Sequence, residues 1–210
     1  MKTAKTFFTE EEKKKIEETT RSVECCTIGE VAVMAVESSD EYREATVLGS
    51  IFLAALTAFS LVEVFFYASI TFFIPLCILL FFPLKMLFTT MPELKTAFIG
   101  RRRKEEAVRQ RAVRAFFEKG LYKTRANTGV LFFLSLLERK VWVLADKGIY
   151  EKINQETLNK FATTVSQGIK EGRACDALCE AIKGAGELLA IHFPITPGDT
   201  DELSNEVMTE

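Results

Sequence analysis

The sequence has little of the chemistry from which metal centres and nucleotide sites are built. Its 210 residues include one histidine, His192. A zinc site draws four ligands mostly from Cys and His, so a His-rich metal centre is excluded. The chain has no Gly-rich loop ending in Lys and Ser or Thr, and no cysteine is followed by arginine six positions later. P-loop nucleotide hydrolases and thiolate phosphatases are therefore excluded.

Disulfides are equally poorly supported. The five cysteines are an odd number without the spacing of a disulfide framework. Cys175 and Cys179 are four residues apart, on one face of a predicted helix, but a metal pair would need two further ligands. We expect reduced, structural thiols in a cytoplasm. The set is Cys25, Cys26, Cys77, Cys175 and Cys179.

The charge balance argues against nucleic acid as a partner. Lys and Arg number 27 and Asp and Glu number 29, which gives a net charge of −2 at pH 7. A nucleic-acid-binding domain usually has a strongly basic face. With 48% apolar residues, the chain is not intrinsically disordered either. Its length is that of one domain, with room for an insertion.

One long segment has almost no charge. Residues 46–88 contain only Glu63 near the middle and Lys85 near the end. A helix needs about 20 residues to cross the bilayer core, so this segment is long enough for two crossings with a short connection. The first 21 residues lack the apolar core of a signal peptide. We therefore predict a transmembrane hairpin; a buried hydrophobic hairpin of a soluble protein is the alternative.

The flanking charges predict the orientation of this hairpin. The 20 residues before it contain one basic residue, Arg43, and the 20 after it contain five. The positive-inside rule then places both flanks in the cytoplasm and the turn outside. We expect that turn between residues 47–62 and 70–88, around Glu63, Tyr67 and Ser69.

The remaining sequence predicts one interrupted α/β domain. Thr9 and Glu12 form a capping-box pattern that opens a helix to about Arg21. Residues 30–37 are apolar on both faces, as in a buried strand, and 129–136 and 140–145 predict a β-hairpin that turns at Glu138 and Arg139. Further helices are expected at 104–119, 153–169 and 178–189, and the last stretch from Thr196 is expected to be disordered.

The strand before the apolar segment needs partners for its backbone hydrogen bonds. The only other predicted strands follow that segment. All three must lie on one side of the membrane to pair, which requires an even number of crossings. Folding and charge distribution thus predict the same topology independently.

The residues that flank these strands resemble the TPM domain family. Its first half is similar to Thr27-Ile28-Gly29-Glu30-Val31 with Tyr42 and Ala45, and its second half to Thr128-Gly129-Val130-Leu131, Glu138-Arg139, Asp146-Lys147-Gly148-Ile149 and His192-Phe193-Pro194. Glu202-Leu203 resembles a closing Asn-Glu-Leu element. The similarity is greatest to bacterial membrane proteins that split the domain with a transmembrane hairpin. It implies a three-layer α/β/α sandwich with a small mixed sheet.

The resemblance implies little about activity. Some plant members are described as acid phosphatases and photosystem-repair factors, and an animal member acts as a receptor accessory subunit. Metal-binding relatives carry acidic residues before the Asn-Gly of the hairpin strand, where this chain has Arg125-Ala126-Asn127-Thr128. The motif residues carried over are Gly29, Glu30, Gly129, Glu138, Arg139, Asp146, Gly148, His192 and Pro194.

Only carboxylates remain as candidates for chemistry. We expect Asp146 to cap a turn or helix, Glu30 to be paired or solvated, and His192 to bond the carbonyls that end its helix. The open alternative is a hard cation, Ca²⁺ or Mg²⁺, and otherwise we expect no cofactor. The weak metal candidates are Asp146, Asp199, Asp201 and Glu202.

A basic stretch follows the apolar segment. Residues 95–125 hold eleven Lys and Arg against three Glu. Such a cluster next to a membrane attracts anionic headgroups, although topology determination alone would explain its first part. RNA binding is disfavoured, because aromatic residues are not interleaved. The expected headgroup contacts are Arg101, Arg102, Arg103, Lys104, Arg109 and Arg111.

These observations predict a bacterial inner-membrane protein, multi-pass, with both termini cytoplasmic. Its partners would be the lipid bilayer, anionic headgroups and a membrane protein of unknown identity. The expected function is an accessory or scaffold module without catalysis; a weak divalent-dependent acid phosphatase and an anionic-lipid-binding peripheral module stay open. The expected segments are a first TPM part at 1–45, the hairpin at 46–88, a basic helical segment at 89–126, a second TPM part at 127–198 and an acidic tail at 199–210.

Overall fold

The computed structural model describes residues 3–65, 70–196 and 202–210. It divides into two compact units. The first unit comprises Met1–Ser39 and Glu105–Glu210, and the second comprises Asp40–Lys104. The second unit is thus inserted into the first, and each is described by itself.

The first unit contains a four-stranded mixed sheet in the order β3-β2-β1-β4. Its strands are β1 (Glu30–Val36), β2 (Gly129–Ser135), β3 (Lys140–Ala145) and β4 (Met208–Thr209). β1 is parallel to β2 and β4, whereas β2 and β3 are antiparallel. The pairing of β1 with β2 confirms that the strands before and after the apolar segment belong to one sheet.

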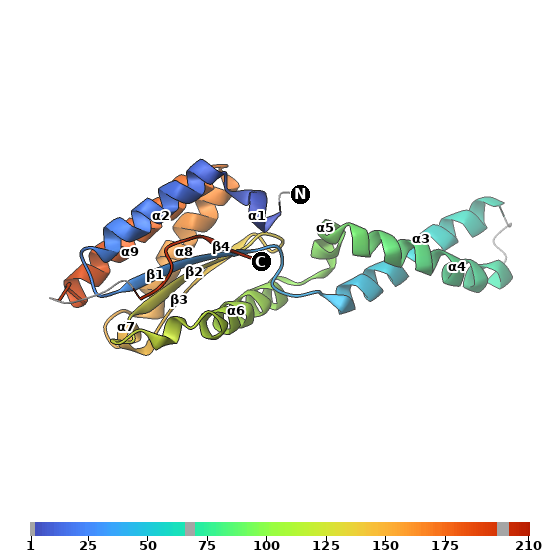
Figure 1. Ribbon diagram of the computed structural model, residues 1–210. Helices are drawn as coiled ribbons and strands as arrows, with labels where there is room; N and C mark the ends of the chain where they lie inside the picture. The colour runs from blue at the N-terminus through green and yellow to red at the C-terminus, as the bar shows by residue number, and fades with distance from the viewer. Residues whose placement is uncertain (1–2, 66–69, 197–201) are drawn as a thin grey trace. The chain divides into compact units, whose positions relative to one another are not determined.

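Helices cover both faces of this sheet (Figure 1). On one face lie α2, α8 and α9, and on the other lies α6. This arrangement confirms the predicted α/β/α sandwich. The helices of the unit are α1 (Ala4–Phe7), α2 (Glu10–Glu24), α6 (Arg101–Glu118, from residue 105 on), the 3₁₀ turn η2 (Leu121–Lys123), α7 (Lys147–Tyr150), α8 (Gln155–Lys170) and α9 (Ala174–His192).

The alternation of side chains along the buried strands produces two separate cores. Val31, Val33 and Ala35 of β1 point into the core under α2, α8 and α9. Ala32 and Met34 point into the core under α6. Because both faces are covered, β1 and β2 are buried along their whole length, which explains their continuous apolar sequences.

Several local signals are confirmed. Thr9 and Glu12 form the predicted capping box, with the Glu12 N–H 3.2 Å from Thr9 Oγ1 and the Thr9 N–H 2.8 Å from Glu12 Oε2. α6 ends before Gly120, which has a left-handed φ of 73°. The β2–β3 hairpin turns at Glu138 and Arg139, and Arg139 has a φ of 52°.

The expectation of a disordered tail is wrong for residues 202–210, while residues 197–201 lie outside the described part of the chain. Residues 202–210 run along the free edge of β1, where Met208 and Thr209 pair with Met34 and Ala35. Leu203 and Met208 also pack against the core under α6. An otherwise unpaired edge of β1 is thus covered by the chain's own end segment, which removes an aggregation-prone edge.

The second unit is a helical hairpin. It comprises α3 (Arg43–Phe65), α4 (Ile70–Thr90), α5 (Pro92–Lys95) and the 3₁₀ turn η1 (Thr96–Phe98), followed by the first residues of α6. α3 and α4 are each long and apolar enough to cross a membrane. The expected turn residues Tyr67 and Ser69 lie outside the described residues, while Glu63 is exposed near the end of α3.

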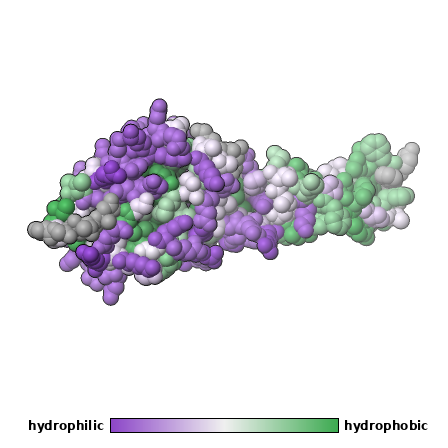
Figure 2. Space-filling view, in the orientation of Figure 1, coloured by the Kyte–Doolittle hydropathy of each residue, from purple (hydrophilic) through white to green (hydrophobic). Residues whose placement is uncertain are grey.

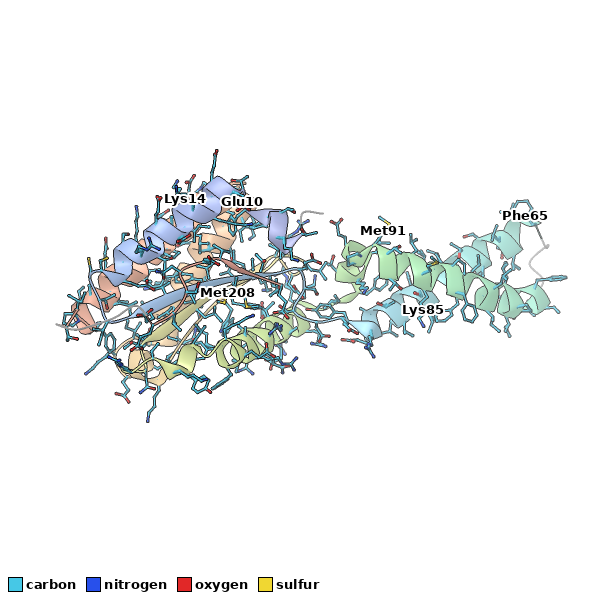
Figure 3. All side chains as sticks on the ribbon, in the orientation of Figure 1. Glu10, Lys14, Phe65, Lys85, Met91 and Met208 are labelled. Carbon is cyan, nitrogen blue, oxygen red and sulfur yellow. The ribbon has the colours of Figure 1, made fainter. Side chains whose placement is uncertain are left out.

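Small residues on α3 bring the two helices together. Ala45, Gly49, Ala54 and Ala58 are buried in a stripe along α3. A Cβ atom at Gly49 would lie 2.5 Å from the ring of Phe88, so only glycine allows this approach of α4. By contrast, Phe88 is the one described residue of α4 that is buried, and Figure 2 shows hydrophobic surface over the hairpin. Figure 3 shows Phe65 at the far end of the hairpin from Met91.

Candidate functional site

The base of the hairpin is held by an ion-pair cluster centred on Arg103. Its guanidinium Nη2 lies 2.5 Å from Asp40 Oδ2, and its Nε lies 3.1 Å from Glu44 Oε1. The same guanidinium lies over the ring of Tyr42, 5.3 Å from the ring centroid. Asp40 precedes α3, Glu44 lies in its first turn, and Arg103 follows η1. The cluster therefore joins the two ends of the hairpin to each other.

The electrostatics of this cluster favour the charged forms. Burial by itself would raise the pKa of Asp40, but the hydrogen bonds from Arg103 and from the Tyr42 N–H outweigh burial and lower it. Arg103 has a raised pKa, chiefly because it donates to Asp40. Tyr42 is completely buried and has a left-handed φ of 49°, a conformation that costs free energy in a bulky residue. The base of the hairpin is thus held in one conformation by the Arg103 ion pairs and by the buried Tyr42.

Aromatic side chains continue the cluster along α3. The ring centroid of Phe98 in η1 lies 6.1 Å from that of Phe52 and 5.6 Å from that of Phe88. After α4, the chain of α5 and η1 consequently folds back beside α3. It does not continue away from the hairpin past the start of α3. In this return segment, which comprises residues 91–98, the apolar side chains of Met91, Leu94 and Phe98 remain exposed.

The six predicted headgroup residues fall into two groups. Four make contacts within the chain: Arg103 as above, Lys104 to the Thr96 carbonyl at 2.9 Å, Arg109 to Glu106 at 2.8 Å, and Arg111 to Glu118 and Glu210. Arg101 and Arg102 are exposed and make no hydrogen bond or ion pair in the part of the chain that the structure describes. Sequence reasoning could not separate these groups, because the distinguishing acceptors are distant in the chain.

The motif residue Glu30 secures the end segment of the chain. Its carboxylate is buried at the start of β1 and accepts hydrogen bonds from the N–H groups of Glu202 and Leu203, at 3.2 and 3.3 Å. Of the two expected environments, the structure therefore shows the paired one. Glu202 accepts in turn from the Arg125 N–H at 2.9 Å and forms an ion pair with its guanidinium at 3.3 Å. Arg125 belongs to the stretch where metal-binding relatives were expected to carry acidic residues, and its side chain is 79% exposed although it pairs with Glu202.

Glu138 plays a similar part at the other end of β1. This buried carboxylate accepts from the Ser39 N–H at 3.1 Å and from the Ser135 hydroxyl. Ser39 and Ser135 hydroxyls are 2.7 Å apart. The network ties the β2–β3 turn to the point where the chain leaves β1. Both motif glutamates therefore have structural partners.

The remaining motif residues allow close backbone approaches. A Cβ at Gly129 would lie 2.4 Å from the Leu121 carbonyl oxygen, and one at Gly148 would lie 2.7 Å from that of Asn127. Asp146 caps α7, as predicted, by accepting from the Lys147 N–H at 2.7 Å. A Cβ at Gly29 would lie 3.1 Å from Leu189 Cδ1, and Pro194 forms an isolated β-bridge with Thr27.

The metal candidates do not converge. Asp199 and Asp201 lie outside the described residues, and Glu202 is paired with Arg125. Within residues 3–65, 70–196 and 202–210, no group of three His, Cys, Asp or Glu side chains could hold a metal ion. His192 is exposed at the end of α9, with its ring beside Phe193, and among these residues it does not bond the terminal carbonyls as expected. The Phe193 carbonyl accepts instead from Thr27 Oγ1 and the Ile28 N–H.

The cysteines are free thiols in the structure. Cys175 and Cys179 are buried in α9, and burial together with the neighbouring Cys179 raises the pKa of the Cys175 thiol to about 12. Such a thiol is protonated and unreactive at neutral pH. Cys25 and Cys26 are exposed after α2.

Two features were missed by sequence reasoning. β4 has only two residues and therefore no recognisable periodicity. The pairing of Arg103 with Asp40 joins residues 63 positions apart, which no local pattern reveals. The only sequence signal for the cluster at the base of the hairpin was Tyr42, which is one of the residues that resemble the TPM family.

Comparison with known proteins agrees with this architecture. The model of the TPM domain matches residues 86–188. The NMR structure of the BA42 protein from the psychrophilic bacterium Bizionia argentinensis is similar over 97% of this chain and 96% of that chain, with a TM-score of 0.61 and 20% sequence identity. At this identity the similarity establishes the fold. No curated protein sequence matches the chain.

Proposed function

Because the model of the TPM domain matches residues 86–188 and the fold agrees with it, we propose that the chain is a membrane-anchored TPM protein of the bacterial inner membrane. In this proposal α3 and α4 cross the bilayer as a hairpin, and the TPM domain lies on the cytoplasmic side with both termini. The domain serves as an accessory or scaffold module for a membrane assembly.

The observation that carries this proposal is the Arg103 cluster. A hairpin anchor must leave the membrane on the side at which it enters, and Arg103 contacts residues at the other end of the hairpin, Asp40 and Glu44. The pairing of β1 with β2 sets the same requirement from the first unit, because the hairpin lies between these strands. Two separate sets of contacts thus support an even number of crossings.

The surface of α4 supports a lipid environment. None of its most apolar 18-residue window is buried, against 39% for α3. Exposed side chains on α4 include Ile70, Ile78, Leu79 and Phe82. An apolar surface of this extent is unfavourable in water and favourable in hydrocarbon. Pro75 and Pro83 inside α4 are compatible with a membrane helix.

An accessory role is supported by what the motif carboxylates do. Glu30 and Glu138 accept hydrogen bonds that hold strands and turns, and Asp146 caps a helix. These contacts give all three carboxylates a structural role, although Asp146 Oδ2 is buried without a hydrogen-bond partner among the described residues. We therefore place the phosphatase second; it stays a prediction, as does the binding of Ca²⁺ or Mg²⁺.

The anchor is tested by placing a charge on the exposed face of α4. Arginine at the centre of a membrane helix costs about 2.5–3.5 kcal/mol of insertion free energy, whereas an exposed Ile→Arg change is harmless in water. We expect the full chain to stay in membranes washed with alkaline carbonate and Ile78→Arg to be released in large part. The matched control, Ile191→Arg on the exposed surface of the first unit, should stay bound. Release of the unaltered chain by carbonate would refute the anchor.

A further inference from the structure

We propose that Arg101 and Arg102, with the exposed apolar residues of the return segment, form a binding site for the headgroup of an anionic phospholipid. This inference rests on the proposed membrane anchor and adds the class of lipid that the base of the hairpin selects. Of the six residues expected to contact headgroups, the site includes Arg101 and Arg102. It excludes the four that are paired within the chain.

The depth of the site follows from contacts within the second unit. Phe52 lies nine residues after Arg43, which is about 13 Å along the helix axis. Phe98 contacts Phe52 and so lies beside the apolar part of α3, whereas Arg103 contacts Glu44 in its first turn. Arg101 and Arg102 lie between Phe98 and Arg103 in the chain. They are therefore placed at the boundary between the apolar surface of the hairpin and its charged base. In a membrane, this boundary lies at the level of the lipid phosphates.

The segment that precedes the two arginines, and the part of α3 beside it, carry exposed apolar side chains. Met91, Leu94 and Phe98 are exposed in the return segment, and Leu48 and Ile51 are exposed on the same part of α3. Side chains of this kind are stable at the boundary of headgroups and acyl chains. A free phosphate would leave this apolar surface in water, so the observations favour a lipid as the occupant.

Charge complementarity selects an anionic lipid. The two guanidinium groups are exposed and make no hydrogen bond or ion pair with the described residues, while neighbouring Arg103 and Lys104 are satisfied within the chain. Lys95 likewise donates to the Glu41 carbonyl. A zwitterionic headgroup carries its own cation, whereas phosphatidylglycerol carries a net negative charge that two arginines can bind.

The test measures lipid preference in the full chain. The protein is incorporated into lipid nanodiscs of phosphatidylcholine and phosphatidylglycerol, and the retained lipids are counted by native mass spectrometry. At about 1 kcal/mol per arginine, Arg101→Gln with Arg102→Gln should lower the preference for phosphatidylglycerol by about thirty-fold. Arg101→Lys with Arg102→Lys should preserve most of it, and high salt should weaken it in the unaltered chain.

The matched control removes two other cations. Arg114 and Lys119 are exposed and make no hydrogen bond or ion pair in the described part of the chain, and Arg114→Gln with Lys119→Gln changes the net charge equally. This control should change the preference by less than about three-fold. An equal loss in both double variants, or no preference in the unaltered chain, would overturn the headgroup site alone. A chain that does not enter the nanodiscs would overturn the anchor, and the site with it.

Discussion

β2 and α4 are both apolar segments of this chain, but they place phenylalanine in opposite environments. Phe132 of β2 is completely buried, whereas Phe82 of α4 is 67% exposed. The first unit folds by removing apolar groups from water between two layers of helices. The second unit leaves them on its surface. A core packed between helices suits the first unit to water, and the exposed apolar surface of α4 is what the proposed membrane anchor requires.

The largest effect on stability is expected from truncating a buried phenylalanine, and an exposed phenylalanine provides the comparison. Phe132→Ala should lower the free energy of unfolding by about 3–5 kcal/mol, because it leaves a cavity in a packed core. Phe82→Ala removes the same side chain from an exposed surface and should cost less than about 1 kcal/mol. Thermal denaturation of the full chain in detergent micelles measures both. A large cost at Phe82 would mean that α4 is packed against protein and would contradict the comparison.

A second prediction concerns the edge of the sheet in the first unit. Glu30→Gln places an amide NH₂ against one of the two N–H groups that the carboxylate now accepts from. A buried donor without an acceptor costs about 1–3 kcal/mol. We expect faster hydrogen exchange at the Glu210 N–H, which bonds to the Ala35 carbonyl. Glu206→Gln, at an exposed position on the same segment, is the control. Unchanged exchange in Glu30→Gln would mean that β4 does not depend on Glu30.

The smallest effect is expected at the base of the hairpin. Since the Asp40 pKa is lowered in the folded protein, its ion pair stabilises above the ordinary carboxyl pKa and is lost as pH falls through the lowered value. The pair is partly exposed, so Asp40→Asn should cost about 0.2–1 kcal/mol at neutral pH. The difference from the unaltered chain should vanish in acid. Thermal denaturation at both pH values measures it, and a difference that grows in acid would contradict the assignment.

The sequence predicted those features that depend on local pattern or on backbone satisfaction. The capping box of Thr9 and Glu12, the stop at Gly120 and the buried strands follow from spacing alone. The pairing of β1 with β2 across the apolar segment followed from the need of a buried strand for partners.

Features that depend on distant contacts could not be predicted. Arg103 and Arg101 are indistinguishable in sequence, and only the position of Asp40 separates a structural cation from a free one. The end segment was predicted to be disordered because its acidic residues suggested solvation. Arg111 and Arg125 neutralise two of these residues, Glu210 and Glu202, in the fold.

The central claim is that the hairpin crosses the membrane and returns, and thiol labelling tests it most directly. Cys25 and Cys26 are exposed in the first unit, and Glu63 is exposed near the end of α3. In intact cells that carry Cys77→Ser, a membrane-impermeant maleimide should label Glu63→Cys from outside. It should reach Cys25 and Cys26 only after the cells are opened. Labelling of Cys25 and Cys26 in intact cells, or failure to label position 63 from outside, would contradict the account.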